Sequence, residues 1–174
     1  MAIPQFKNVI TGIDVDFTGC SVDDLAVTCG VGITAAGQEA WDDVVARAVA
    51  EDLVGIEALS GIPGTVADAT RDNASAHGQS VSDSVASVRT WDHLGDQQKT
   101  FPAVDCEFGD GTSRFQERLP DGRPRYEVLE VKLLVRQGDL TQPLTDGALA
   151  EGLGAQPGAR VPLARVREYL LDPS

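Results

Sequence analysis

The sequence predicts an α+β fold in which a mainly antiparallel sheet is flanked by helices. Two observations carry this prediction. Two strand-like segments follow each other near the start of the chain. Later strand-like segments are separated by segments whose apolar residues have helical spacing. Adjacent strands with a short polar connection favour a hairpin, whereas a strict alternation of strand and helix would favour a parallel sheet.

A hairpin followed by a helix is predicted for the first third of the chain. Residues 8–17 and 24–32 have β-branched content and partial alternation, and the polar segment 18–23 separates them. Residues 38–53 then repeat apolar side chains at helical spacing, with charged side chains on the other face. The apolar stripe expected to pack on the sheet consists of Trp41, Val44, Val45, Ala48 and Val49.

One strand and several connections are predicted in the middle of the chain. Residues 81–91 alternate as a strand, and 92–99 are polar enough for a turn. Residues 101–108 suit a short helix, because a proline near their start is compatible with a first helical turn. Glycine, proline and aspartate predict a loop at 109–112 and a turn at 119–124.

The clearest strand lies at 126–136. Leu129, Val131, Leu133 and Val135 share one face there, so we expect this strand in the middle of the sheet. Two short helices are expected to follow. They cover residues 145–153 and 163–171, the second preceded by a proline.

Composition limits the classes of partner. The 174 residues suffice for one domain with a substantial core, and no apolar run approaches the ~18 residues of a membrane helix. A formal charge of −13 argues against nucleic acid and anionic membranes, and favours a neutral or apolar small molecule. The first residues lack the features of a signal peptide, which predicts a cytoplasmic protein. Three widely spaced cysteines and two histidines indicate neither a disulfide framework nor a metal site.

The most informative stretch runs from Gly55 to Val81 and is rich in small residues and turn formers. Gly61 and Gly64 flank Ile62-Pro63, so the backbone can take positive φ on either side and direct unpaired N–H groups at one point. An anion or a cofactor could bind there. A tight helix-to-strand connection without a ligand explains the same residues equally well.

The order of residues in this stretch resembles a known flavin-contacting loop. Residues 57–66, followed by Asn73, Ala76, Gly78 and Gln79, are similar to the loop of UDP-N-acetylenolpyruvoylglucosamine reductases, the MurB-type flavoenzymes. Further similarity lies at 41–49, 87–92 and 161–168. The resemblance implies the fold of the second flavin-binding subdomain of MurB-type and related flavoproteins. It also implies that residues 1–174 form a single MurB-like domain without the first flavin subdomain and the C-terminal substrate domain.

Departures from the family pattern imply that flavin is not the ligand. Ala67 and Ser75 stand where the family has glycine, and Asp68 and Asp72 add negative charge beside an anionic cofactor. We therefore expect no cofactor.

The segment 108–116 is similar to the active-site segment of the same reductases. Ser113 and Phe115 match the family. Asp110, Gly111 and Gln116 replace a tyrosine, an arginine and a lysine, so the resemblance implies that the reductase chemistry is lost.

Truncated, flavin-free relatives are associated with polyether antibiotic pathways such as that of tetronasin, where they resemble oxadecalin-forming cyclases. This resemblance implies a formal [4+2] cyclisation of a small apolar polyketide in an apolar pocket. Expected catalytic residues are His77, Ser113, Asn73 and Tyr126. Expected substrate-binding residues are Gln79, Trp91, Phe115 and Ile62.

Two alternatives remain open. The chain could be a non-catalytic module that binds a small molecule, or a flavin-dependent reductase completed by a partner chain. Apolar surface exposed by missing domains could also be covered in a homodimer. Bound flavin or turnover would discriminate among these hypotheses.

Overall fold

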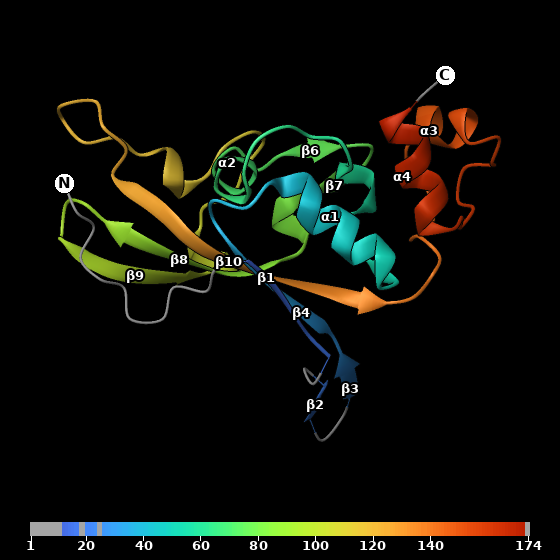
Figure 1. Ribbon diagram of the computed structural model, residues 1–174, viewed down its shortest axis with the longest axis horizontal. Coiled ribbons are helices and arrows are strands. Elements are labelled where there is room, and N and C mark those ends of the chain that lie inside the picture. Colours follow the sequence, from blue (N-terminus) through green and yellow to red (C-terminus); the bar gives the residue numbers. More distant parts are fainter. Residues whose placement is uncertain (1–11, 18–19, 24–25, 173–174) are drawn as a thin grey trace.

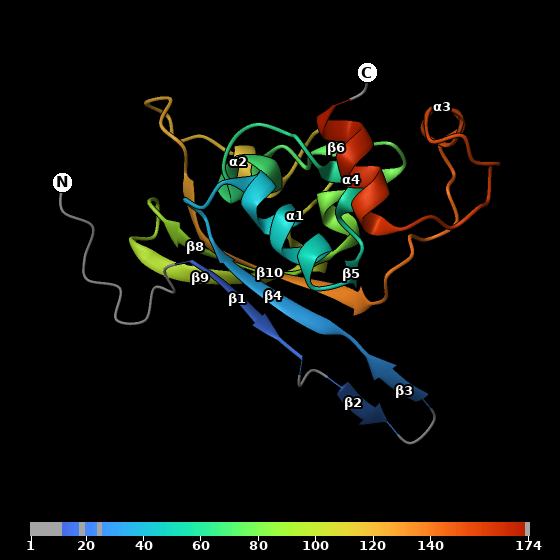
Figure 2. The same cartoon turned by 45° about the vertical axis from the view of Figure 1, so that its right-hand side comes forward.

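The computed structural model describes residues 12–17, 20–23 and 26–172, and it confirms the α+β fold with a mainly antiparallel sheet. Every pairing in the main sheet is antiparallel. Its strand order is β1 (Ile13–Asp16), β4 (Val31–Ala36), β10 (Tyr126–Gln137), β8 (Val85–Asp92) and β9 (Gln97–Pro102). Helices α1, α2 and α4 lie together on one face of this sheet (Figures 1 and 2).

Strand β10 occupies the centre of the sheet, as predicted. Val131, Leu133 and Val135 alternate with more exposed residues and are buried beneath the helices. The register to β8 shifts between Val128 and Glu130, which marks a β-bulge. Because a bulge interrupts the two-residue period, Val128 and Leu129 are both buried although they are neighbours.

The predicted N-terminal hairpin is only partly confirmed, because the first strand pairs antiparallel with residues 32–35, largely beyond the predicted second strand 24–32. Strand β1 pairs with β4, and Ile13 lies opposite Ala35. Residues 20–23, expected to be a connection, instead form strand β2 (Cys20–Asp23), which pairs with β3 (Ala26–Cys29). Residues 8–11 of the predicted first strand lie outside the described residues.

Helix α1 (Trp41–Ala50) buries the predicted apolar stripe, including Trp41, Val44, Val45 and Ala48. The helix is shorter than the predicted range of 38–53. Leu53 and Val54 form strand β5 instead and pair with the far end of β10, so the chain has already turned back to the sheet.

The prediction of a helix at 101–108 is wrong. Gln97–Pro102 forms strand β9, the sheet edge that pairs with β8, and only a short 3-10 turn, η3 (Ala103–Asp105), follows. Phe101 gains burial against the core through this pairing, which local sequence could not reveal. Residues 81–83 form the 3-10 turn η2 (Val81–Asp83), so β8 begins later than predicted.

The predicted turn at 92–99 is too long, because β8 includes Asp92 and β9 begins at Gln97. The remaining predicted turns and the two C-terminal helices are confirmed. Gly109 and Thr112 exchange backbone hydrogen bonds, and the Gly122 N–H donates to the Leu119 carbonyl. The chain ends with α3 (Gly147–Gly152) and α4 (Leu163–Leu171), which enclose a second, smaller apolar cluster. Within the described ranges, no helix has the length and apolar character needed to cross a membrane.

Candidate functional site

The glycine-rich stretch folds into several short elements. These are η1 (Glu57–Leu59), α2 (Val66–Arg71), β6 (Ser75–Ala76) and β7 (Gln79–Ser80). Gly61 and Gly64 have positive φ, as predicted, with values of 80° and 105°.

The bend around Gly61 is tied to the helices rather than open to a ligand. The Gly61 N–H donates to Asp42 Oδ1 at 2.8 Å, so the expectation of an unpaired amide is wrong here. Arg167 of α4 donates two hydrogen bonds to the same carboxylate, at 2.8 and 2.9 Å. These hydrogen bonds keep the pKa of Asp42 below its usual value. Asp42 therefore joins α1, the glycine-rich bend and α4.

The start of α2 is closed by the chain itself. Thr65 and Asp68 form a reciprocal capping box, in which the Thr65 N–H donates to Asp68 Oδ2 at 3.0 Å and the Asp68 N–H donates to Thr65 Oγ1 at 3.1 Å. The Ala67 N–H donates to the Gly37 carbonyl at 2.9 Å. These amides are occupied, and Asp68 brings a carboxylate to the same place. The residues of this loop therefore do not fit the anionic pyrophosphate of a flavin cofactor.

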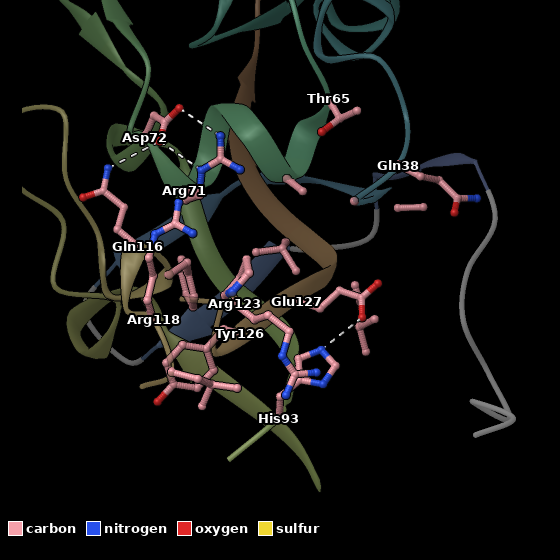
Figure 3. A pocket seen from close by; sticks show the side chains of 18 residues that line it. Gln38, Thr65, Arg71, Asp72, His93, Gln116, Arg118, Arg123, Tyr126 and Glu127 are labelled. Atoms are coloured by element: carbon pink, nitrogen blue, oxygen red, sulfur yellow. Dashed lines mark hydrogen bonds and ion pairs between the residues drawn. The ribbon is translucent and has the colours of Figure 1, made fainter. Parts of the chain in front are cut away.

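The main cavity lies between α2, the 3-10 turn η4 (Arg114–Gln116), the end of β4 and the start of β10. Its volume is about 1090 Å³. Side chains of Ala67, Phe115, Leu119, Val128 and Leu129 give it an apolar lining. Polar side chains gather around this lining (Figure 3), among them Arg71, Asp72, Arg118, Arg123, His93 and Glu127.

One wall of the main cavity is a close backbone approach at Gly37. The Gly37 N–H donates to the Leu129 carbonyl at 2.9 Å, beside the β-bulge of β10. A Cβ atom at position 37 would lie 2.1 Å from the Val128 carbonyl oxygen. Only glycine allows β4, α2 and β10 to meet this closely.

The arginines of the main cavity differ in how far their charge is neutralised. Arg71 pairs with Asp68 at 3.1 Å and with Asp72 at 3.0 Å, and Arg123 pairs with Asp121 at 2.7 Å. Arg118 donates to the Gly122 carbonyl at 2.8 Å, and no carboxylate in the described part of the chain pairs with it. Arg118 is thus the cavity arginine with uncompensated charge.

Two of the predicted site residues line the main cavity. Phe115 is buried, and its ring meets the Tyr126 ring edge-on with the centroids 6.1 Å apart. Within the described residues, the Tyr126 hydroxyl has no hydrogen-bond partner. Trp91 and Ile62 line neither the main cavity nor the smaller cavity beside η1.

Asn73 and Ser113 use their polar groups to hold loops together. Asn73 Nδ2 donates to the Gly109 carbonyl at 2.8 Å, and its Oδ1 accepts from the Ser82 N–H at 2.9 Å. Ser113 Oγ donates to the Arg71 carbonyl at 2.6 Å and accepts from the Phe115 N–H at 3.1 Å. Both side chains have structural partners in this geometry.

His77 and Gln79 line this smaller, second cavity of about 350 Å³, between β6–β7, η1 and residues 141–149. His77 Nδ1 lies 3.2 Å from Asp146 Oδ2, at the N-cap of α3. Gln79 Nε2 donates to Glu57 Oε1 at 3.0 Å, and Gln79 Oε1 accepts from the Ala58 N–H at 2.9 Å. The structure therefore divides the predicted site residues between two cavities.

The charged residues of the main cavity, above all Arg118 and Arg123, were not predicted from the sequence. Arg118 directly precedes the predicted turn at 119–124 and Arg123 lies within it, and this recurrence of arginine around a turn was the available signal. In Figure 3 the Arg118 side chain lies on the Arg71 side of the cavity and the Arg123 side chain lies beside His93, a placement that the local sequence does not reveal.

The antiparallel sheet and its helices have the α+β fold of part of MurB. The chain is homologous to part of the UDP-N-acetylenolpyruvoylglucosamine reductases. It is 40% identical to that of Thermobifida fusca over 168 residues, which are 96% of this chain and 45% of the relative. It is 38% identical to that of Cutibacterium acnes over 161 residues, which are 92% of this chain and 40% of the relative.

A solved structure confirms the fold. The crystal structure of MurB from Thermus caldophilus matches with a TM-score of 0.51 at 23% identity, over 60% of this chain and 36% of that chain. The present chain thus spans less than half the length of these curated relatives. No protein-family model matches it.

Proposed function

We propose that this domain is a cofactor-independent cyclase of polyketide or polyether antibiotic biosynthesis. It folds a linear polyene within the main cavity and closes it by a formal [4+2], inverse-electron-demand hetero-Diels–Alder reaction. The product carries a tetrahydropyran or oxadecalin ring. The observation that carries the proposal is the main cavity itself, which combines an apolar lining with Tyr126, whose hydroxyl has no hydrogen-bond partner among the described residues.

Such a reaction requires no redox cofactor and no acid–base pair from the protein. It is an isomerisation in which two σ bonds form at the expense of π bonds, so it needs no oxidant, reductant or net proton transfer. Holding the two reacting segments in contact supplies much of the rate, because the entropy of folding the chain is lost on binding. Phe115, Val128 and Leu129 provide the apolar surface on which the polyene folds.

Tyr126 is the catalytic candidate that the geometry favours. Its hydroxyl can donate a hydrogen bond to a carbonyl oxygen of the heterodiene, where negative charge develops in the transition state. His77 lies in the second cavity, and Asn73 and Ser113 are engaged by the backbone. We therefore assign the donor role to Tyr126 alone among the four.

The reductase activity of the relatives receives less support from this part of the chain. Asp68 and the backbone occupy the amides at the start of α2. Gln116, where the relatives' pattern has a lysine, donates to Asp72 at 3.3 Å and to the Gly111 carbonyl at 2.8 Å.

The test is incubation of the purified chain with linear polyether precursors, followed by chromatography for a product of unchanged mass. Tyr126→Phe should lower kcat by about tenfold or more. His77→Ala, which changes the second cavity, is the matched control and should retain activity.

Other outcomes would replace the proposal. Loss of activity in His77→Ala but not in Tyr126→Phe would move the site to the second cavity. Ligand-induced stabilisation without turnover would indicate a binding module. Bound, reducible flavin after incubation would indicate a reductase completed by a partner chain.

A further inference from the structure

We infer that the main cavity recognises an anionic end group, a carboxylate or an acidic enol, on an otherwise apolar ligand, and that Arg118 pairs with this group. The inference deepens the proposed function by specifying its substrate class, and it rests on that function only for the identity of the substrate. It differs from the expectation drawn from net charge, which favoured a neutral ligand.

At Arg118 the charge beside the main cavity is opposite in sign to that of the whole chain. Carboxylates pair with Arg71 and Arg123, whereas none among the described residues pairs with Arg118, although the formal charge of the chain is −13. Salt screens charges over about 8 Å at physiological ionic strength, so the groups at the cavity mouth outweigh distant carboxylates. An anion is therefore favoured at this point of the surface.

Arg118 has capacity for a further partner, whereas its neighbours have less. Arg71 is held by Asp68 and Asp72, and hydrogen bonding to Arg71 lowers the pKa of Asp72. Arg123 is held by Asp121. The Arg118 guanidinium donates to the Gly122 carbonyl, which orients the group without neutralising it. A planar guanidinium can offer two parallel N–H groups to a carboxylate.

The position of Arg118 beside the apolar lining indicates a ligand with an anionic end and an apolar body. In Figure 3 the Arg118 side chain points toward the Arg71 side of the cavity, with Gln116 nearby. Phe115 and Leu119 supply apolar surface next to the same arginine. A ligand whose apolar body covers these side chains would exclude water from the ion pair, and exclusion of water strengthens the attraction between opposite charges.

The experiment compares a carboxylate with a neutral ligand of the same chain length. Decanoate and 1-decanol are titrated into the full chain and followed by calorimetry and by melting temperature. We expect decanoate to bind more tightly than 1-decanol. Arg118→Gln should weaken decanoate binding by about tenfold, the equivalent of one lost charged hydrogen-bonding partner, and leave 1-decanol binding unchanged.

Arg160→Gln is the matched control, because Arg160 is exposed and lies outside the lining of both cavities. It removes the same charge and should leave binding of both probes unchanged. Equal decanoate affinity in Arg118→Gln and the unaltered chain would overturn the inference. So would 1-decanol binding as tightly as decanoate, or an equal loss of decanoate affinity in Arg160→Gln.

The cyclase assay separates this inference from the proposed function. If decanoate binding requires Arg118 and no polyene is cyclised, the cyclase proposal fails and the anion site stands. If cyclisation proceeds with an unchanged KM in Arg118→Gln, the anion site fails and the cyclase proposal stands.

Discussion

The two cavities of this domain differ in how their polar groups are used. In the second cavity, Glu57 and Gln79 hydrogen-bond to each other and to backbone amides, and His77 faces Asp146. In the main cavity, within the described residues, no carboxylate pairs with Arg118 and the Tyr126 hydroxyl has no hydrogen-bond partner. Both cavities contain polar side chains, so polarity alone does not distinguish them.

This difference separates polar groups that hold the fold from polar groups that can serve a ligand. A buried group that is already paired would have to break its bonds before binding anything else. An unpaired group beside apolar surface gains a partner on binding. The following substitutions test this distinction, and the second cavity is expected to give the largest effect on stability.

Glu57→Ala should cause the largest loss of stability, about 3 kcal/mol of unfolding free energy. Glu57 is 1% exposed and accepts from the Gly55 N–H at 2.8 Å and from Gln79 Nε2 at 3.0 Å, so its removal leaves both donors without an acceptor. Chemical denaturation measures the change. Glu57→Gln retains one acceptor oxygen and should lose less. A loss below about 0.5 kcal/mol in Glu57→Ala would show that the second cavity is not a structural network.

Asp92→Asn should cost about 2 kcal/mol at neutral pH. The Asp92 carboxylate is 1% exposed and accepts from Arg125 Nε at 3.1 Å, and Arg125 lowers its pKa. Because the pKa of Asp92 is lower in the folded than in the unfolded state, its ionisation stabilises the fold at every pH above the unfolded-state pKa of about 4. This stabilisation is lost as the pH falls toward the folded-state pKa. The stability difference between the two proteins should therefore shrink below about pH 4. A pH-independent difference would contradict this assignment.

Asp68→Ala should cost about 1 kcal/mol, because it removes one half of the capping box at the start of α2. Thermal unfolding provides the measurement. Asp83→Ala is a useful comparison, since Asp83 forms the same reciprocal arrangement with Ser80 at η2. If Asp68→Ala were stabilising, the carboxylate would be serving something other than this helix start.

His77→Ala should have the smallest effect, a change of about 0.5 kcal/mol or less. Its polar contact with Asp146 joins partly exposed side chains, and such contacts contribute little in water. Differential scanning calorimetry would detect a larger effect. A loss comparable to that of Glu57→Ala would mean that the β6–β7 hairpin depends on this pair.

The spacing of apolar residues predicted those elements in which this spacing alone decides which side chains are buried. The alternation through Val131, Leu133 and Val135 placed β10 at the sheet centre, and the stripe on α1 predicted its buried face. Strand β9 escaped prediction because its first three residues, Gln97 to Lys99, are polar and become a strand only by pairing with β8. Helix α2 has six residues within a glycine-rich stretch, and its capping box was the one local signal.

The candidate site was only partly predictable, because sequence proximity does not decide which cavity a side chain enters. Phe115 and Tyr126 lie in the main cavity as members of the predicted site. Asn73, His77 and Gln79 were grouped with them because they follow the same loop. In the fold, Asn73 binds the Gly109 loop, whereas His77 and Gln79 face η1 and the α3 region.

The contact at Gly37 limits how the binding pocket can change during evolution or engineering. Any larger residue would push against the Val128 carbonyl and force β4 away from the bulge of β10. New ligand shapes cannot be accommodated by remodelling that wall. Diversification is instead open at the exposed residues around 118–123, so related chains that accept different substrates should vary at this turn and retain glycine at position 37.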